Sequence, residues 1–375
     1  MNENIRVLIA AHIRWYNAEA EYAHRLARGL VERGAKAVVW GRPGSPLVMA
    51  CERDEIPCVT AADPGSIEPD KILETARVLR DLIKRGGFSV VNALRSEGYP
   101  VIARTARRAG AFVVRTRGDM RMPKFAALNG LVYRRWTDRV VVANDLLREE
   151  LILRLGLPEN KVRTIRLGIN PEDVAPSDDP EAVRRRLGVK NGERVVGVMG
   201  RLGPVKGQEF VLKAADKILE KAPDTRFLVI YRDIEESDKL LPALRNSPHR
   251  NRFVFVGPER GHVEAMQVAD LAVIPSVGSE AHCRVALEWM ALGKPVIGSR
   301  VGVIPEIIEH GTTGFLVQPR YSDTLAECIV ELLLNPGRAK RMGEAGRQRL
   351  IERFTEERMV EENLEVFRQT TEKGR

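Results

Sequence analysis

The sequence of 375 residues is poor in cysteine and in aromatic side chains. Its four cysteines, Cys51, Cys58, Cys283 and Cys328, include no C-x-x-C pair. This usage is typical of a cytoplasmic protein with reduced thiols and argues against a disulfide-stabilised secreted domain. Aromatic residues make up only 5% of the chain, and no stacking or recognition motif accompanies them. A nucleic-acid-binding protein is therefore a remote alternative that only the basic charge supports.

Long apolar segments are also missing. No apolar run approaches the roughly 18 residues that a membrane-spanning helix needs. The N-terminal stretch "MNENIRVLIAAHIRWYN" lacks the apolar core of a signal peptide. We therefore expect a cytoplasmic protein, with a peripheral position on the inner face of the cytoplasmic membrane as an option.

Several common enzyme motifs do not occur. The sequence contains no D-x-D and no H-E-x-x-H, so no metal site is indicated. It has no G-x-S-x-G nucleophile elbow, and without a G-x-G-x-x-G fingerprint a nicotinamide-dependent dehydrogenase is not expected. The six histidines are scattered along the chain.

Positive charge is present in excess, and it is unevenly distributed. Residues 1–170 carry 29 Lys and Arg against 19 Asp and Glu, whereas the remainder carries 31 against 32. The N-terminal half therefore holds all of the excess. An excess of positive charge in one half suggests a surface that binds a polyanion, an anionic lipid surface or a phosphorylated substrate. Simple surface solubility explains a bare charge count equally well.

Short apolar strands alternate with amphipathic helices in two series. The strands are expected at 5–10, 37–40, 88–93, 111–116 and 139–143, and then at 194–200, 226–230, 252–257, 271–275, 295–299 and 314–317. The helices are expected at 17–32, 70–84, 208–221, 324–334, 337–353 and 356–367. Continuous apolar strands separated by helices indicate parallel sheets covered on both faces.

The two series predict two Rossmann-like, doubly wound α/β domains. A polar, proline-rich segment at 167–183 is the expected join, which gives domains 1–168 and 169–375, the second including the three C-terminal helices. Ligands of open parallel sheets bind beyond the carboxyl ends of the strands, so a central cleft between facing domains is the default site.

A glycine-rich loop follows the first strand of the second series. In "GVMGRLGPVKGQEF", Gly200 begins the loop, Arg201 and Lys206 add two cations, and a helix starts near Gly207. Backbone N–H groups at a helix N-terminus favour an anion, so a phosphate site is one interpretation. A tight strand-to-helix turn with two surface cations is the other.

Two glutamates eight residues apart flank a helix start in "SEAHCRVALE". Glu280 is expected on the loop before a helix that begins near His282, and Glu288 about two turns inside it. Glutamate is common on solvated helix faces, which is the plainer interpretation. The position after a small-residue loop at the end of a strand instead favours ligand binding.

Polar residues also follow three strands of the first series. Arg115, Arg117 and Arg121 surround Asp119, and guanidinium groups keep such a carboxylate ionised and able to act as a base or nucleophile. Arg95 and Asn17 lie in loops that open on the same edge. A surface cluster of ion pairs is the alternative explanation.

Together these segments resemble a known family. The stretch from Glu280 to Glu288, with 290–317 after it, resembles the E-x7-E signature of retaining glycosyltransferases of family 4, which have the GT-B fold. "GRLGPVKG", residues 200–207, is similar to that family's G-R-L-x-x-x-K-G loop, and residues 163–170 resemble its interdomain segment. The resemblance covers nearly the whole second domain, whereas the first domain matches mainly in layout.

The resemblance implies a role for each matching residue. Glu288 would bind the ribose hydroxyls of the nucleotide, and Glu280 the hydroxyls of the transferred sugar. Arg201 and Lys206 would neutralise the donor diphosphate as it leaves, without a metal ion. The N–H groups of Ala281, His282 and Cys283 would face the sugar and the diphosphate, beside the loop that begins at Gly200.

The chain departs from the family pattern in three places. Asn17 and Ala18 replace a Gly-Gly pair, and Ala281-His282-Cys283 replaces Gly-Phe-Gly. Gly118 stands where many members have a catalytic histidine, with Asp119 matching the following aspartate. Asp119, Arg117, Arg95 and Asn17 therefore remain the candidates on the acceptor side.

The resemblance implies a metal-independent hexosyltransferase that retains the anomeric configuration and needs no cofactor beyond its nucleotide diphosphate-sugar donor. The expected acceptor is a cell-envelope glycolipid or polysaccharide precursor, with the lipopolysaccharide core as the leading type. The basic N-terminal half could rest on an anionic membrane. A GT-B sugar-nucleotide epimerase or hydrolase that uses no acceptor is the alternative.

Overall fold

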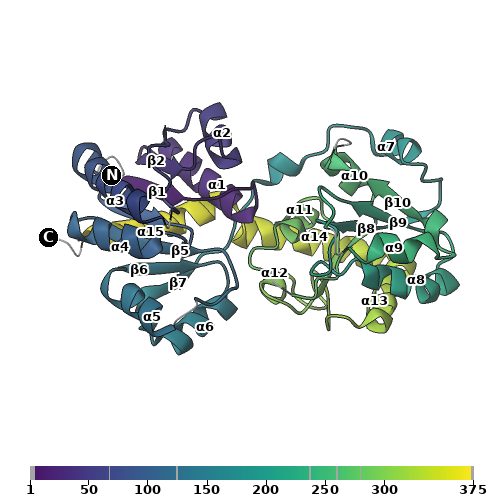
Figure 1. Cartoon of the computed structure of the whole chain (residues 1–375). Helices are drawn as coiled ribbons and strands as arrows, with labels where there is room; N and C mark the ends of the chain where they lie inside the picture. Colours follow the sequence, from purple (N-terminus) through teal and green to yellow (C-terminus); the bar gives the residue numbers. More distant parts are fainter. Residues whose placement is uncertain are drawn as a thin grey trace. The chain divides into compact units, whose positions relative to one another are not determined.

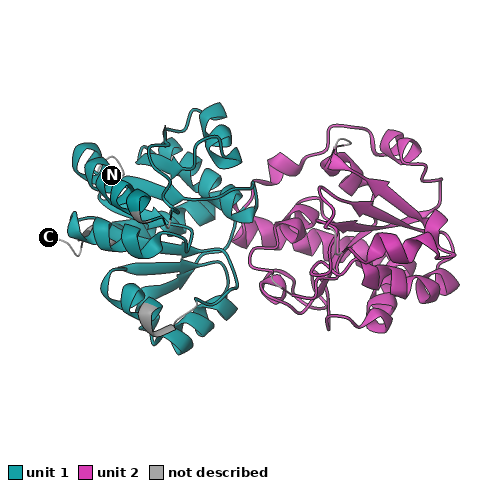
Figure 2. Ribbon diagram, in the orientation of Figure 1, with its two compact units in different colours: residues 1–168, 356–375 teal, residues 169–355 magenta. Residues whose placement is uncertain are grey.

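The computed structural model describes residues 5–66, 68–123, 126–235, 238–258, 261–278 and 280–372. By its internal contacts the chain separates into two compact units (Figures 1 and 2). Unit 1 comprises Met1–Gly168 and Glu356–Arg375, and unit 2 comprises Ile169–Thr355. Each unit is built on its own parallel sheet.

Unit 1 contains a seven-stranded sheet of order β3-β2-β1-β4-β5-β6-β7. The strands are β1 (Arg6–Ala11), β2 (Lys36–Gly41), β3 (Cys58–Val59), β4 (Val90–Ala93), β5 (Phe112–Arg117), β6 (Arg139–Val142) and β7 (Val162–Thr164). The helices are α1 (Ala18–Glu32), α2 (Pro46–Arg53), α3 (Pro69–Gly86), α4 (Tyr99–Arg108), α5 (Ala126–Arg135), α6 (Asp145–Leu155) and α15 (Glu356–Glu372), with a 3₁₀ turn η1 (Glu159–Lys161).

Both faces of this sheet are buried. Val7 and Ile9 of β1 belong to one apolar cluster, with residues of α1 and α15. Leu8 and Ala10 belong to another, with residues of α3 and α4. Successive side chains of a strand point to opposite faces, so a continuous apolar run requires cover on both sides. The predicted doubly wound sheet is confirmed.

Unit 2 repeats this architecture with a six-stranded sheet of order β10-β9-β8-β11-β12-β13. The strands are β8 (Arg194–Met199), β9 (Thr225–Ile230), β10 (Phe253–Val256), β11 (Leu271–Ile274), β12 (Val296–Ser299) and β13 (Gly314–Val317). The helices are α7 (Pro180–Arg186), α8 (Glu209–Lys221), α9 (Leu240–Arg245), α10 (His262–Gln267), α11 (Arg284–Ala291), α12 (Ile304–Ile307), α13 (Ser322–Leu334) and α14 (Pro336–Arg353), with 3₁₀ turns η2 (Pro171–Val174) and η3 (Arg250–Arg252).

The last helix, α15, belongs to unit 1 and not to the second domain, where the sequence analysis placed it. Its buried residues Val360, Leu364 and Phe367 lie in the apolar cluster of α1 and β1. Fully burying one such side chain contributes about 1.5–3 kcal/mol, so this apolar face determines where the helix packs. Figure 1 shows the helix, in yellow, among the elements of unit 1.

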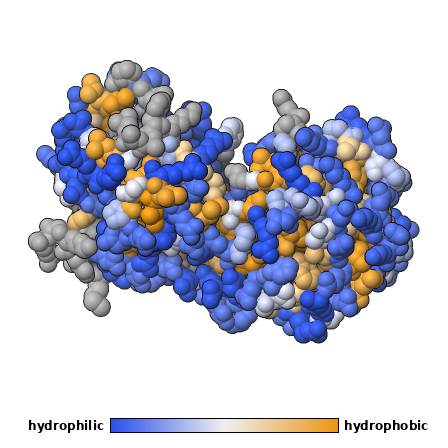
Figure 3. Space-filling view, turned by 90° about the horizontal axis from the view of Figure 1, so that it is seen from below, coloured by the Kyte–Doolittle hydropathy of each residue, from blue (hydrophilic) through white to orange (hydrophobic). Residues whose placement is uncertain are grey.

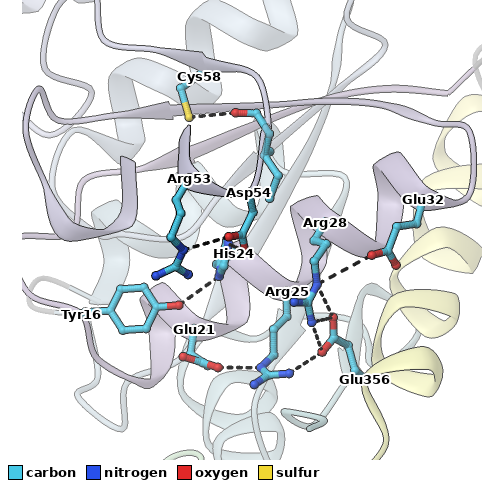
Figure 4. A network of polar contacts seen from close by, with 11 residues as sticks. Tyr16, Glu21, His24, Arg25, Arg28, Glu32, Arg53, Asp54, Cys58 and Glu356 are labelled. Atoms are coloured by element: carbon cyan, nitrogen blue, oxygen red, sulfur yellow. Dashed lines mark hydrogen bonds and ion pairs between the residues drawn. The ribbon is translucent and has the colours of Figure 1, made fainter. Parts of the chain in front are cut away.

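A polar network also attaches the start of α15 to α1 (Figure 4). The Glu356 carboxylate accepts hydrogen bonds from Arg25 and, at 2.7 Å, from Arg28. Arg25 is itself buried and also donates to Glu21 at 2.6 Å. A buried carboxylate needs such cationic partners, because burial without them is costly.

Within the part of the chain that the structure describes, no helix combines the length and apolarity needed to cross a membrane. The face in Figure 3 is mainly hydrophilic, with hydrophobic side chains in scattered patches. Trp15, Leu73 and Leu153 are strongly exposed, and all three belong to unit 1.

Candidate functional site

The glycine-rich loop of unit 2 connects β8 to α8 and is held against the end of β11. Gly207 has φ +67°, and a Cβ atom there would lie 2.2 Å from the carbonyl oxygen of Pro275, so only glycine fits this close approach. Val277 donates its backbone N–H to Val205 at 2.9 Å, and Gln208 bonds the carbonyl of Arg201 at 2.9 Å. These contacts bring the loop beside the segment that carries Glu280.

Lys206 and Glu280 form an ion pair at the carboxyl edge of this sheet. Lys206 Nζ lies 2.6 Å from Glu280 Oε1, which also accepts from Ser276 Oγ at 2.5 Å. The carboxylate is 4% exposed. Burial opposes the charge of Lys206, but Glu280 outweighs it and raises the pKa of the lysine. The two predicted residues are thus brought together as a charged pair.

The backbone of Glu280 is fixed by the loop after β12. Val303 donates its N–H to the Glu280 carbonyl at 2.8 Å. Gly302 lies so close that a Cβ atom would be 1.9 Å from that carbonyl oxygen. The glutamate side chain is therefore presented from a backbone with little freedom to shift.

Arg201, the other cation of the loop, has a different partner. Its Nε lies 2.7 Å from Glu235 Oε1, and the guanidinium side chain is 54% exposed. Glu235 was not among the residues predicted from the sequence. Its backbone N–H bonds the carbonyl of Leu202 at 2.8 Å, which places it beside the glycine-rich loop.

Helix α11 begins at Arg284, two residues later than predicted. Its N-cap, Cys283, has φ 45°, which is a left-handed conformation that non-glycine residues adopt rarely. Ala281, His282 and Cys283 therefore precede the helix. Burial raises the pKa of the Cys283 thiol, with Glu280 adding to it, so the thiol stays protonated.

Glu288 lies one turn inside α11, not two as predicted. It is buried at 5% exposure, and its Oε1 is 2.9 Å from Arg284 Nη2. The next residue, Trp289, packs its ring against Gly197 of β8, where a Cβ atom would lie only 2.6 Å from the ring. This packing fixes the rotation of α11 and with it the direction of Glu288.

In unit 1, Asn17 caps α1. Its Oδ1 accepts hydrogen bonds from the backbone N–H groups of Glu19 and Ala20, each at 3.1 Å. Asparagine is a preferred N-cap because its oxygen satisfies first-turn donors. A contact of Asn17 with an acceptor stays a prediction, and the geometry gives the residue a structural role.

Arg117 positions the loop that follows β5. Its guanidinium is 1% exposed and donates to Tyr133 Oη at 3.2 Å, to Asp119 Oδ1 at 3.1 Å and to the carbonyl oxygen of Arg121. Arg121 returns a backbone N–H to Asp119 Oδ1 at 3.0 Å. Asp119 is 31% exposed and is thus oriented by a buried cation, while its own catalytic role stays a prediction.

Arg115, two residues before Arg117 on the same face of β5, is fully buried. It donates to the carbonyl oxygens of Ala93 and Thr116 at 2.9 and 2.5 Å and to Ser96 Oγ at 3.1 Å. The bonds to Ala93 and Ser96 join β5 to the end of β4 and the segment after it. Arg115 therefore holds this edge of the sheet together.

Arg95 pairs with a carboxylate that the sequence analysis missed. Its Nη1 lies 2.5 Å from Glu19 Oε2, and its Nη2 lies 3.2 Å from Glu97. Glu19 is 6% exposed, and burial raises its pKa while Arg95 opposes the shift. Glu19 could have been predicted as a site residue from its position in the first helical turn after β1, at the carboxyl edge of a parallel sheet.

Across the described ranges, no group of three or more His, Cys, Asp or Glu residues is arranged to hold a metal ion. Lys206 and Arg201 are the cations that the glycine-rich loop supplies. The metal-independent mechanism stays a prediction.

Both units match known protein families. The model described as Glycosyltransferase Family 4 matches residues 20–173, and the model described as Glycosyl transferases group 1 matches residues 179–349. An uncharacterized glycosyltransferase of Methanocaldococcus jannaschii is 32% identical over 61% of this chain and 60% of its own length. A D-inositol 3-phosphate glycosyltransferase of Kribbella flavida is 28% identical over 63% of this chain and 57% of its own length.

The matched region thus spans about 60% of these curated relatives. Among solved structures, Anabaena HepE in complex with UDP superposes with a TM-score of 0.84 at 21% identity, covering 97% of this chain and 100% of that one. Together with the two parallel sheets, these matches show that the chain belongs to the group 1 and family 4 glycosyltransferases and has their GT-B fold.

Proposed function

We propose that this chain transfers a sugar from a nucleoside diphosphate-sugar to a hydroxyl group of an acceptor, with retention of the anomeric configuration. The observation that supports it most is the arrangement of Lys206, Glu280 and Glu288 at the carboxyl edge of the unit 2 sheet. A cation paired with one buried carboxylate, with a second buried carboxylate on the helix that follows, suits a ligand that carries both phosphates and hydroxyls.

Each of these residues would bind the part of the donor that matches its chemistry. Lys206 and Arg201 would exchange their carboxylate partners for the diphosphate and stabilise the negative charge that grows on it as the bond to the sugar breaks. Glu280, once released, would accept hydrogen bonds from sugar hydroxyls. Glu288 would accept from the ribose, and backbone N–H groups of 281–283 would contact the sugar and diphosphate.

The acceptor hydroxyl would form the new bond to the anomeric carbon on the face from which the diphosphate departs, so that the anomeric configuration is retained. Asp119, oriented by Arg117, is our candidate to receive the hydroxyl proton. We propose that no metal ion is required, because the two cations of the glycine-rich loop serve the leaving group.

UDP-sugars are the first donors to test, because the structure of Anabaena HepE, a GT-B neighbour, contains UDP. For the acceptor we propose a cell-envelope glycolipid or polysaccharide precursor, with the lipopolysaccharide core as the leading type. Unit 1 carries 33 Lys and Arg against 25 Asp and Glu, a balance that favours an acceptor with anionic groups or one embedded in an anionic membrane.

A small phosphorylated polyol is a second acceptor class, suggested by the Kribbella flavida relative, which is named as a D-inositol 3-phosphate glycosyltransferase. Flotation with anionic and neutral vesicles at low and high salt distinguishes a membrane-embedded acceptor from a small phosphorylated one. Salt-sensitive flotation with anionic vesicles supports the membrane acceptor. No flotation at low salt removes the membrane surface and favours the small acceptor.

Nucleotide binding tests the donor half directly. We expect UDP, or GDP or ADP in parallel, to raise the melting temperature, and Glu288→Ala to abolish the rise. Glu220→Ala, an exposed residue of α8, is the matched control and should keep it. An unchanged shift in Glu288→Ala would remove the ribose role. Rapid donor turnover without an acceptor would instead indicate a hydrolase or epimerase.

A further inference from the structure

Three neighbouring strands of the unit 1 sheet, β1, β4 and β5, end at one edge. Glu19 lies in the first turn of the helix after β1, Arg95 directly after β4, and Asp119 directly after β5. Asp119 acts electrostatically on Glu19, and so does Arg115. The side chains of these segments therefore share one local environment.

Glu19 is only half satisfied in this environment. Its Oε2 receives Arg95 at 2.5 Å, but among the described residues its Oε1 has no hydrogen-bond partner, although the atom is buried. The side chain is 7% exposed. Buried carboxylate oxygens are nearly always bonded, so this oxygen calls for a partner from outside the chain, either an ordered water or a ligand.

Two donors on the same edge are also unsatisfied. The Nε of Arg95 and the Nδ2 of Asn92 are buried and find no partner in the part of the chain described. The Arg95 side chain as a whole remains 29% exposed, so part of it lies at the rim of the edge. Asn92 is fully buried in β4, and its Oδ1 accepts from Thr116 at 2.8 Å.

The Glu19 carboxylate and the Arg95 guanidinium together limit which chemical group could bind to both. A carboxylate oxygen accepts only, whereas a guanidinium N–H donates only. An anion would meet the charge of Glu19, and a cation would meet the charge of Arg95. A hydroxyl group satisfies both, because it can donate to Glu19 Oε1 while it accepts from the Arg95 guanidinium.

We propose that Glu19 and Arg95 form a binding site for a hydroxyl group of a polyhydroxylated ring, the acceptor ring of the proposed transfer. Only the identification of this ring as the acceptor rests on the proposed function. The polyol site itself depends on the unit 1 geometry and is testable without any nucleotide.

Saturation-transfer NMR on the full chain tests the site with myo-inositol, methyl α-D-glucopyranoside and glycerol as probes, and with inorganic phosphate and succinate as anions without a ring hydroxyl. We expect at least one ring polyol to bind. Its dissociation constant should rise about tenfold in Glu19→Gln, because the charge-assisted hydrogen bond is weakened.

Glu97→Gln is the matched control, since Glu97 is the other carboxylate on Arg95 but is 46% exposed. It should bind the polyol as the wild type does. The melting temperature of Glu19→Gln should not fall, because the variant removes a half-satisfied buried charge.

Equal polyol binding by wild type and Glu19→Gln, or no binding by any ring polyol, would overturn the proposal. Weaker binding accompanied by a lower melting temperature would also overturn it, since that shows a structural role. A nucleotide-induced thermal shift without polyol binding removes this site alone. Polyol binding without any nucleotide shift removes the proposed transferase function and leaves the site.

Discussion

In unit 2 each candidate carboxylate faces a cation, Glu280 at 2.6 Å from Lys206 and Glu288 at 2.9 Å from Arg284. In unit 1 the buried Glu19 has a cation on one oxygen, while within the described chain its other oxygen has no partner. The two glutamate sites therefore differ in their partners. On our proposals, the Lys206–Glu280 pair opens to receive a diphosphate, whereas Glu19 keeps one oxygen for a ligand hydroxyl while the other stays paired with Arg95.

The largest expected effect concerns the exchangeable pair of unit 2. Lys206→Ala should lower kcat for transfer by about 100- to 1,000-fold, because a preorganised cation at the leaving group is lost. It should also leave Glu280 buried without its cation. Steady-state kinetics with UDP-glucose and the identified acceptor measure the effect.

Lys217→Ala is the control for Lys206→Ala, since Lys217 lies on α8 but pairs with the exposed Asp323. It should retain activity within about twofold, as an exposed pair contributes little. A Lys206→Ala enzyme with wild-type kcat would show that the pair with Glu280 is purely structural.

Asp119→Asn should reduce transfer by about 100-fold, the lower end for loss of a general base, and leave the nucleotide-induced thermal shift unchanged. The amide keeps the size of the side chain and an oxygen for Arg117 and the backbone N–H of Arg121. Transfer kinetics and thermal shift are both needed. If Asp119→Asn lost nucleotide binding as strongly as transfer, Asp119 would not act on the acceptor alone.

Arg284→Leu should weaken UDP binding by roughly tenfold and destabilise unit 2 by about 3 kcal/mol, because Glu288 would remain buried without its cation. Titration calorimetry and denaturant unfolding measure the two effects. Adding Glu288→Gln should restore much of the stability without restoring binding. A double variant as unstable as Arg284→Leu would show that the arginine acts through packing alone.

The sheets could be predicted from the sequence because their buried strands are continuous apolar runs that need helices on both faces. The matching motifs also predicted Lys206 and Glu280 as site residues, but not that the two pair with each other. The start of α11 was not predicted correctly, because cysteine is an unusual residue for the left-handed conformation of Cys283. The family pattern has a glycine at this position, and glycine adopts a positive φ readily, so that departure was the signal available.

Long-range partners account for the other differences. Helix α15 joins unit 1 through Glu356, whose partners Arg25 and Arg28 lie more than 300 residues away in sequence. Glu19 meets Arg95 across 76 positions. Neither pairing has a local pattern, so only the folded chain reveals them. Asn17, by contrast, could have been identified as an N-cap directly before an amphipathic helix.

The smallest effect is the pH dependence of stability that Glu19 imposes. Burial raises the folded-state pKa of Glu19 above its ordinary value of 4.5, with Asp119 adding to the shift and Arg95 opposing it. The folded chain therefore holds this proton more tightly than the unfolded chain. As pH rises from 4.5 through the folded-state pKa, wild-type stability falls relative to a variant that cannot ionise.

Glu19→Gln should consequently match the wild type below the unfolded-state pKa and exceed it increasingly as pH rises, with a constant difference above the folded-state pKa. Each unit of pKa shift corresponds to about 1.4 kcal/mol. Melting curves of both proteins from acid to neutral pH measure the difference, with Glu97→Gln as control. Because the pKa of Glu97 is lowered, despite burial, by its own backbone N–H and Arg95, its variant should lose stability as pH rises. A Glu19→Gln curve that falls below wild type at neutral pH would show that the bond to Arg95 outweighs the cost of burial, and unit 1 would then resemble unit 2.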